Sequence, residues 1–180
     1  PVPETERSNR RHRPLGLGVQ GLADLFAKFR IAFDSKEARE LNKHVFETIY
    51  FGAMTSSCSI AEERECDMIE YKELLHKLID ESGATIKKNN YYSKETYDML
   101  TYIVSIDTDR LTELYEKLLP IKEELEREEY LGSYSSFIGS PLYNGELQFD
   151  MCGVEPTTCH DWHGLREKIK KYGIRNSLLL

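Results

Sequence analysis

The sequence lacks any apolar run long enough to cross a membrane, and it contains no recognisable signal peptide. It also lacks a P-loop, an HExxH motif and a Ser/His/Asp set, so the usual motifs of hydrolytic and triphosphate chemistry are missing. The cysteines, which are Cys58, Cys66, Cys152 and Cys159, form no CxxC pair. These absences predict a cytoplasmic protein with no membrane anchor and no disulfide framework.

Acidic residues dominate one part of the chain. The 180 residues carry a formal net charge of −7 at pH 7, and 40% of them are hydrophobic, which is typical of a folded protein. Residues 65–130 hold 17 acids and 9 bases, a net charge of −8, whereas the remainder holds 14 acids and 15 bases. This asymmetry predicts a separate acidic surface element and gives no support to nucleic-acid binding.

Residues 9–26 combine a cationic entry, a short apolar run and the start of a helix. Residues 1–8 contain two prolines and are expected to form a linker or an arm. A strand is predicted over residues 15–19, after a proline that is tolerated at a strand start. Gly21 is predicted to open a helix that runs toward Phe29.

The same stretch spells G-x-G-x-x-G with Gly16, Gly18 and Gly21. A dinucleotide-binding loop needs a buried strand before its first glycine, so that the following helix start can face the pyrophosphate. Residues 10–14 are basic and end in proline, so they cannot be that strand. The glycines are therefore expected to let a strand and a helix approach closely.

A long amphipathic helix is predicted over residues 35 to about 64. Asp34 is a suitable N-cap with Glu37 three residues later, a pairing that satisfies two free amides at a helix start. The apolar stripe of this helix is expected to be core rather than a cofactor site. The stripe consists of Ala38, Leu41, Val45, Ile49, Ala53 and Ile60.

The acidic part of the chain is itself patterned as helices. Its first helix continues or restarts from the preceding one and ends near Ser82. Further helices are expected to begin at Ser93 and at Asp107 or Thr108. Pro120 lies inside the last apolar pattern and predicts a kink or a new helix.

The remaining elements alternate between extended and helical patterns. They are a surface loop over residues 132–145, a strand over 147–151, a helix ending at Tyr172 and a strand over 174–180 that runs off the end of the chain. Thr158 or Asp161 is expected to cap the helix at its start, and Gly173 is expected to stop it.

One cluster of metal-binding residue types comprises Cys152, Cys159, His160 and His163. Its C-x6-C-H-x2-H spacing matches no closed zinc site, because an adjacent Cys and His cannot easily face one tetrahedral centre. Incidental thiols in a half-exposed loop are the expected outcome. The basic run 10–13 could meet phosphates, but a solvated or ion-paired edge is expected there. Cys58 is expected to be a small core residue.

Three blocks of sequence resemble one family in the same order. The first is residues 9–64, which contain NRRHRPLGLGVQGLADLF and LNKHVFETIY. The second is residues 139–151, which contain GSP and GELQFDM. The third is residues 171–179, KYGIRNSLL. Together they resemble the large catalytic subunit of class I ribonucleotide reductase.

The resemblance implies an α/β fold class, namely a partial segment of a ten-stranded α/β barrel. Residues 15–19, 147–151 and 174–180 would be barrel or flanking strands, with the long helix packed outside. In the family, residue 64 would run almost directly into residue 132. The implied organisation is a barrel segment over residues 1–64, an inserted all-helical subdomain over residues 65–131 and a barrel segment over residues 132–180.

The resemblance also implies a part of an oxidoreductase, the ribonucleoside-diphosphate reductase large subunit. That enzyme reduces ribonucleotides to 2′-deoxyribonucleotides for DNA synthesis by radical chemistry. The implied partners are the remainder of the large subunit, a small subunit that supplies the radical, ribonucleoside diphosphate substrates, and allosteric ATP or dNTP effectors. No nucleic-acid or membrane partner is implied.

The family's catalytic motifs fall outside these residues. Its Asn-x-Cys-x-Glu motif would lie upstream, and its Pro-Met-Pro-Thr-Ala-Ser phosphate loop would begin just past Leu180. The cysteines match neither motif nor the family's redox pair. No catalytic, cofactor-binding, substrate-binding or metal residue is therefore assigned, and the segment is expected to be an inactive scaffold when isolated.

A second hypothesis makes residues 65–131 an acidic helical interaction module for assembly or partner binding. It rests on the charge of −8 over residues 65–130 and on interspersed tyrosines, because aromatic residues are favoured at interfaces. These tyrosines are Tyr91, Tyr92, Tyr97, Tyr102 and Tyr115. An inert surface elaboration is the alternative. Deleting residues 65–131 from the full large subunit would separate the two, since an inert elaboration leaves assembly and activity unchanged.

Overall fold

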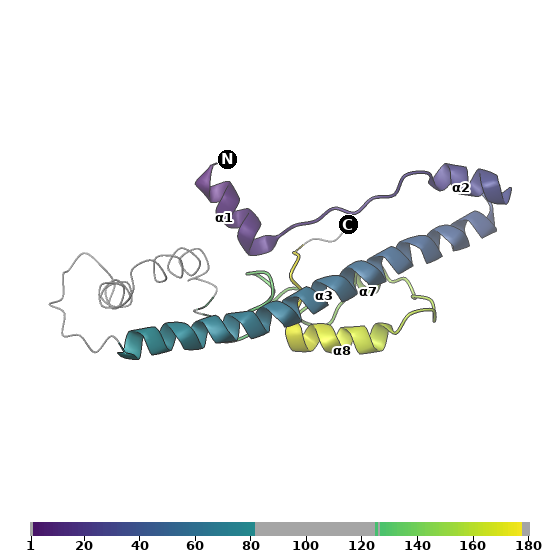
Figure 1. Ribbon diagram of the computed structural model, residues 1–180. Coiled ribbons are helices and arrows are strands. Elements are labelled where there is room, and N and C mark those ends of the chain that lie inside the picture. Colours follow the sequence, from purple (N-terminus) through teal and green to yellow (C-terminus); the bar gives the residue numbers. More distant parts are fainter. Residues whose placement is uncertain (1, 82–124, 126, 178–180) are drawn as a thin grey trace. The chain divides into compact units, whose positions relative to one another are not determined.

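The computed structural model describes residues 2–81, 125 and 127–177. The chain divides into two compact units, of which the first is Pro1–Arg64 with Gly132–Leu180 and the second is Glu65–Leu131. The described helices are α1 (Pro3–His12), α2 (Leu22–Phe29), α3 (Lys36–Glu81), α7 (Gln148–Met151) and α8 (Trp162–Tyr172), shown in Figure 1. No helix among the described residues is long and apolar enough to cross a membrane.

The N-terminal residues, expected to form a linker or an arm, are not an irregular linker, because residues 3–12 form the helix α1. Pro3 occupies the first helical position, where its missing N–H costs nothing. Acidic residues occupy the first turn and basic residues the last, an arrangement that complements the helix dipole. Glu6 and Arg10 also form an i,i+4 ion pair, with 2.7 Å between Oε1 and Nη2. A proline that usually signals a break here starts the helix.

The helix predicted from Gly21 toward Phe29 is confirmed as α2. Gly21 precedes it in the left-handed conformation, with φ 82°, so glycine is needed here for its backbone freedom. The strand predicted over residues 15–19 is not formed. Only Leu15 makes an isolated bridge, and the rest of the run is extended without a ladder among the described residues. A strand needs a ladder with a neighbouring strand, and the described residues contain none for residues 16–19.

The long helix is confirmed, but its start and its buried stripe differ from the prediction. Ser35, not Asp34, is the cap, because its Oγ accepts the Ala38 N–H at 3.1 Å. The helix continues unbroken to Glu81. Most of the predicted stripe is only half-buried, and Ile60 is exposed. The fully buried positions of α3 in the first unit are Ala38, Met54, Ser57, Cys58 and Ala61.

Residues 147–151 form a short helix instead of the predicted strand. The Leu147 N–H donates to Asp150 Oδ2 at 2.7 Å, and the Met151 N–H donates to the Leu147 carbonyl at 3.2 Å. Five residues of alternating polarity are too few to distinguish a strand from one helical turn. The Asp150 carboxylate, which accepts the Leu147 N–H, stabilises the helical turn. The preceding loop, 132–145, is irregular as predicted, but it is not all at the surface, since Ser133, Tyr134 and Phe137 are buried.

The helix predicted to end at Tyr172 is confirmed as α8. Asp161 caps it by accepting the Gly164 N–H at 2.8 Å, and Gly173 follows its last residue. The strand predicted over residues 174–180 is not found in its described part, 174–177. The amides there are used elsewhere, because Arg175 N–H donates to the Ser57 carbonyl at 3.1 Å instead of to a neighbouring strand. Residues 178–180 lie outside the described residues.

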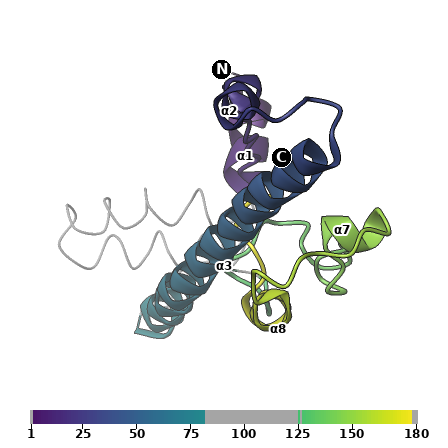
Figure 2. The same ribbon diagram turned by 90° about the vertical axis from the view of Figure 1, so that its right-hand side faces the viewer.

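The core of the first unit forms between α3, α8 and the 132–147 loop. Phe137, Leu147 and Ile169 are fully buried. The Phe137 ring packs edge-on against Tyr134 and Tyr143, with centroids 5.7 and 5.9 Å apart. Helix α8 lies alongside α3 in both views (Figures 1 and 2), where Lys168 Nζ and Glu62 Oε2 are 2.7 Å apart.

The second unit has a small described core of its own. Met68, Leu125 and Leu131 are buried together, and Tyr71 packs against them. Lys72 Nζ donates to the Arg127 carbonyl at 2.9 Å. The inserted helical subdomain stays a prediction, because the helices expected from Ser93 onward and the break at Pro120 lie outside the described residues.

Thiol chemistry tests the burial of Cys58, the predicted core cysteine. Its side chain is fully buried, and burial raises the pKa of its thiol to about 11. The other three cysteines are exposed. At pH 8, an aromatic disulfide reagent is expected to titrate three thiols rapidly in the folded chain and four in urea. Four rapidly reacting thiols in the folded chain would contradict the burial of Cys58.

Candidate functional site

A carboxylate on α3 holds the loop that leads into α8. Glu47 Oε1 accepts the Thr157 N–H at 2.9 Å, the Thr157 hydroxyl at 3.0 Å and the Trp162 indole N–H at 2.9 Å. Its second oxygen, Oε2, is buried and has no hydrogen-bond donor among the described residues. One side chain therefore fixes both ends of residues 157–162. We call Glu47, Thr157, His160 and Trp162 the Glu47 cluster.

Aromatic rings surround the Glu47 cluster. Phe51 stacks on His160 with centroids 4.6 Å apart, and it meets Trp162 edge-on at 5.0 Å. Phe149 meets the other side of Trp162 at 4.9 Å. His160 Nε2 also lies 3.0 Å from Thr48 Oγ1. Trp162 is buried by these rings, and it is the only tryptophan of the chain. Its fluorescence therefore reports on the packing of this cluster.

The pKa of Glu47 is lowered from its ordinary value of 4.5. Burial alone would raise it, but the hydrogen bonds from Trp162 and Thr157, with the nearby His160, outweigh burial. The folded pKa thus lies below the unfolded one. The stabilisation is fully present above pH 4.5 and is lost as the pH falls through the folded pKa.

Acid is therefore expected to destabilise the wild-type chain more steeply than a Glu47→Gln variant. The glutamine keeps an acceptor oxygen for Thr157 and Trp162 but has no charge to lose. Urea midpoints at pH 7 and pH 3, followed by Trp162 fluorescence, measure the difference. Glu146→Gln removes an exposed carboxylate and serves as the control. Equal acid sensitivity of Glu47→Gln and wild type would contradict the role of Glu47.

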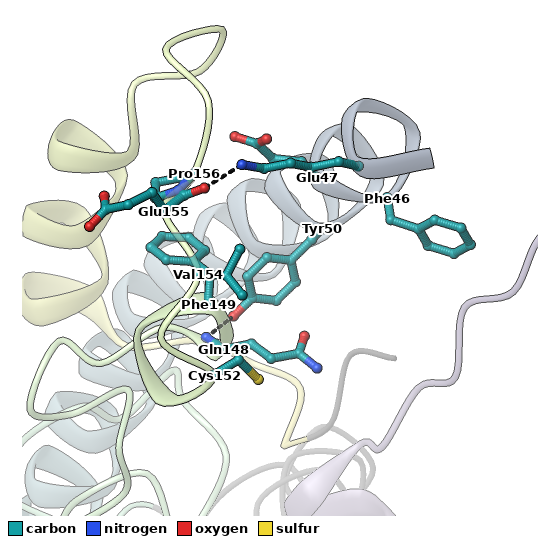
Figure 3. Close-up of a pocket in the computed structure, with 10 residues that line it drawn as sticks. Phe46, Glu47, Tyr50, Gln148, Phe149, Cys152, Val154, Glu155 and Pro156 are labelled. Atoms are coloured by element: carbon teal, nitrogen blue, oxygen red, sulfur yellow. Dashed lines mark hydrogen bonds between the residues drawn. The ribbon is translucent and has the colours of Figure 1, made fainter. Parts of the chain in front are cut away.

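A mostly apolar cavity of about 260 Å³ opens beside Glu47 (Figure 3). Its walls include Tyr50, Phe149 and Val154, which face one another in the close-up. The Gln148 N–H donates to the Tyr50 hydroxyl oxygen at 3.2 Å, and Lys43 Nζ donates to the Glu155 carbonyl at 2.5 Å. Burial raises the pKa of the Tyr50 hydroxyl. The cavity thus offers aromatic and aliphatic contacts, with its cation already engaged by a backbone carbonyl.

A second polar cluster ties the end of α1 to residues 175–177. The Arg175 guanidinium donates to the carbonyls of Arg10, at 2.5 Å, and Arg11, at 3.3 Å. Asn176 Nδ2 donates to the Arg13 carbonyl at 2.8 Å, and the Ser177 N–H donates to the His12 carbonyl at 2.8 Å. We call residues 10–13 with 175–177 the carbonyl clamp. It supplies the partners that carbonyls at a helix C-terminus otherwise lack.

The carbonyl clamp is anchored on α3 by a buried serine. The Ser57 hydroxyl donates to Asn176 Oδ1 at 2.8 Å and accepts the Asn176 N–H at 3.0 Å. Both Ser57 and Asn176 are buried. Every polar atom of the Asn176 side chain therefore has a partner, and the cluster joins three separate stretches of the first unit.

The Cys and His residues considered as metal ligands are not brought together. Cys152 lines the cavity beside Glu47, whereas Cys159 Sγ lies 4.0 Å from His44 Nδ1. His160 is stacked on Phe51 instead. Among the described residues, no group of three or more His, Cys, Asp or Glu side chains could hold a metal ion.

The basic run 10–13 uses its backbone as much as its side chains. Arg10 pairs with Glu6, and Arg11 Nε donates to Ser135 Oγ at 3.2 Å. These contacts match the expected ion-paired edge. The explanation offered for the glycine motif fails at Gly18, because an added Cβ would meet no described atom within 4 Å. Close approach to α2 or α3 therefore does not require glycine there.

Sequence reasoning missed the residues that organise the site. Glu47 and Arg175 lie within the blocks that resemble the family, but no local pattern predicts a role for either. Local patterns carry no information on partners more than 100 positions away, and both residues act at that range. The sequence does carry a signal for the clamp, since the polar run Arg175-Asn176-Ser177, one residue beyond the helix-stopping Gly173, interrupts the apolar pattern of a strand.

Comparisons with known proteins identify the family. Residues 1–180 match the family model described as "Ribonucleotide reductase, barrel domain". The ribonucleoside-diphosphate reductase large subunit of Caenorhabditis elegans is 38% identical over 180 residues, which are 100% of this chain and 14% of that protein. The large chain of Schizosaccharomyces pombe is 36% identical with the same coverage. The large subunit of Monkeypox virus is 33% identical over 100% of this chain and 15% of that protein.

The chain spans 14% to 15% of the length of these relatives. The match nevertheless runs through every residue of the chain, so it includes the three blocks noted in the sequence. The resemblance inferred from those blocks is confirmed. The chain belongs to the ribonucleotide reductase family, as a segment of the barrel domain of a large subunit.

Proposed function

We propose that this chain is part of a ribonucleoside-diphosphate reductase large subunit that reduces ribonucleoside diphosphates to 2′-deoxyribonucleotides for DNA synthesis. The observation that carries the proposal is the family match over residues 1–180, supported by 33% to 38% identity to reductase large subunits. In this proposal the longer protein, called the parent below, takes its radical from a small subunit and is regulated by ATP or dNTP effectors.

Within the parent, the described residues act as scaffold. The support is the use made of their polar groups, since Glu47 and Arg175 both bond to groups of the same unit. Glu47 fixes the loop before α8, and Arg175 fixes the end of α1. Substrate contact and radical transfer are then the work of residues elsewhere in the parent. In this proposal the radical-generating centre belongs to the small subunit.

The intact mass of the native protein tests this proposal first. An antibody raised against the 180 residues would capture the protein from its source for mass spectrometry. A mass far above 20.9 kDa is expected, because the chain would be a slice of a full large subunit. A native mass near 20.9 kDa would contradict the proposal.

Activity is the second test. The captured parent, mixed with its small subunit, is expected to convert a ribonucleoside diphosphate to the 2′-deoxy product. The isolated 180-residue chain is expected to show no turnover under the same conditions. Turnover by the isolated chain would overturn the scaffold assignment, and an inactive parent of full length would overturn the assignment of the reaction.

A further inference from the structure

The carbonyl clamp changes the electrostatics at the end of α1. The last carbonyls of a helix have no N–H partner within it, so a helix C-terminus carries partial negative charge and repels anions. Here the carbonyls of residues 10–13 all accept hydrogen bonds, two of them from the Arg175 guanidinium and the others from Asn176 Nδ2 and the Ser177 N–H. A positively charged group therefore lies where a helix end is normally negative.

Two serines lie beside this end of α1. Arg11 Nε donates to Ser135 Oγ at 3.2 Å, and the Ser135 N–H donates to the Arg11 carbonyl at 3.1 Å. Ser136 is exposed, and its Oγ lies 3.5 Å from His12 Nδ1. Tyr134, the residue before the two serines, is buried, and its ring centroid lies 6.5 Å from that of His12. The hydroxyl of Ser136 and the imidazole of His12 are thus held next to each other in an exposed position.

Arg13 adds a guanidinium that is not engaged by the described part of the chain. Its side chain is exposed, and it makes no hydrogen bond or ion pair with any described residue. Arg10 differs, because it is paired with Glu6. Arg13 follows His12 directly, with their Cα atoms about 3.8 Å apart, so an anion beside Ser136 would lie within reach of its long side chain. The ion-paired edge expected for the basic run therefore stops short of Arg13.

We propose that this surface binds a phosphate group, carried by free phosphate or by a small phosphate monoester. The inference goes beyond the proposed function and uses only residues of this chain. A bound phosphate needs positive charge and several hydrogen-bond donors that converge on its oxygens. Arg13 and Arg175 supply the charge, and the Ser136 hydroxyl can donate a hydrogen bond. We call this surface the Ser136 site; it comprises His12, Arg13, Ser135 and Ser136.

The groups at the Ser136 site favour phosphate over a carboxylate. A guanidinium can bond two oxygens of one anion through its planar fork. A hydroxyl and an imidazole offer further donors for a third oxygen, which a phosphate monoester has and a carboxylate lacks. The monoester also carries close to two negative charges at neutral pH. Within the described ranges, no acidic side chain is bonded to His12 or Arg13 and competes for this position.

Amide hydrogen exchange of the protein at its native length tests the proposal. Exchange is followed in peptides that cover residues 9–15 and 132–138, in sodium phosphate and in sodium chloride of the same ionic strength, so that general screening is matched. A phosphate bound between the two segments is expected to slow exchange in both peptides at least threefold. Equal exchange in the two salts would overturn the proposal.

Arg13→Gln is the variant that tests the site most directly. Glutamine keeps a polar side chain but removes the charge, and the fold is expected to tolerate it because the guanidinium is bonded to no described residue. The slowing by phosphate is expected to disappear in Arg13→Gln and to weaken in Ser136→Ala. Lys28→Gln, which removes an exposed cation from α2, is the matched control and is expected to keep the slowing. Slowing that persists in Arg13→Gln, or that Lys28→Gln loses equally, would contradict the Ser136 site.

The same assay identifies the source of the phosphate group. Inorganic phosphate and glycerol 3-phosphate are titrated separately, and the concentration for half-maximal slowing is compared. A lower value for glycerol 3-phosphate assigns the site to phosphate monoesters, and an equal or higher value assigns it to the free anion. No slowing with either compound overturns the proposal. This outcome is independent of the turnover and mass measurements that test the proposed function.

Discussion

Replacing Gly173 with alanine is expected to destabilise the chain by about 4 kcal/mol. Gly173 has φ 73° and ψ −162°, a backbone region that is open essentially only to glycine. An added Cβ would lie 2.8 Å from Ser133 Cβ and 3.2 Å from the Phe137 ring. Both neighbours are buried, so neither can move aside cheaply. Urea unfolding followed by Trp162 fluorescence measures the loss.

Gly153→Ala is the matched control for this prediction. Gly153 also has positive φ, at 63°, but an added Cβ would meet no described atom within 4 Å. The control should therefore cost only the conformational strain, about 1 kcal/mol. If both variants lost the same free energy of unfolding, the contact of Gly173 with Ser133 and Phe137 would not be the cause.

Replacing Arg175 with methionine is expected to cost about 3 kcal/mol of the free energy of unfolding. Methionine keeps much of the apolar stem but removes the guanidinium that holds the carbonyls of Arg10 and Arg11. Hydrogen bonds from a charged donor are stronger than neutral ones, and the Arg10 carbonyl loses its guanidinium partner in a part-buried site, whereas the Arg11 carbonyl keeps the Ser135 N–H at 3.1 Å. The loss should concentrate in α1, where amide hydrogen exchange is expected to accelerate most.

Arg175→Lys separates the charge from the geometry. Lysine keeps the positive charge but lacks the planar fork that reaches two carbonyls at once. An intermediate loss is expected, with α1 exchange between that of wild type and Arg175→Met. Arg175→Met within about 0.5 kcal/mol of wild type would show that the carbonyl clamp contributes nothing to stability.

The sequence predicts best those helix ends that are marked by a capping residue or a glycine. The sequence predicts the start of α2 at Gly21, the stop of α8 at Gly173 and, as one of two candidates with Thr158, the α8 cap at Asp161, because a cap or a left-handed glycine acts within one turn. The start of α1 is not predicted, because a proline usually ends a helix, whereas Pro3 occupies the first helical position. Helix ends are set by residues within about one turn, so a misread residue there affects only that helix end.

The strand predictions were wrong for a different reason. A strand is stabilised by its ladder, and the described residues supply no ladder partner for residues 15–19 or 174–177. Residues 147–151 were too few for their period to distinguish a strand from a helix, and Asp150 capped them as α7. The sequence blocks are enough to recognise the barrel family. Whether a predicted strand forms depends on the neighbouring strand it would pair with, and that strand is distant in sequence.

The residues that organise the site were beyond local patterns altogether. Glu47 meets Trp162 across 115 positions, and Ser57 meets Asn176 across 119. Neither pair follows from helix or strand spacing. The stripe predicted for α3 illustrates the same limit, since the sequence shows that a face is apolar but not which neighbour covers it.

The carbonyl clamp sets an order of events during synthesis. Arg175 reaches the Arg10 carbonyl across 165 positions, so a ribosome adding 5–20 residues per second needs roughly 10–30 s to supply the partner. Until then the Arg10 carbonyl at the end of this ten-residue helix lacks its guanidinium partner, and so short a helix is marginal by itself. Although α1 precedes the other described helices in the chain, its end is therefore held by Arg175 only late, and a nascent chain stalled before Arg175 should expose residues 3–12 to proteases.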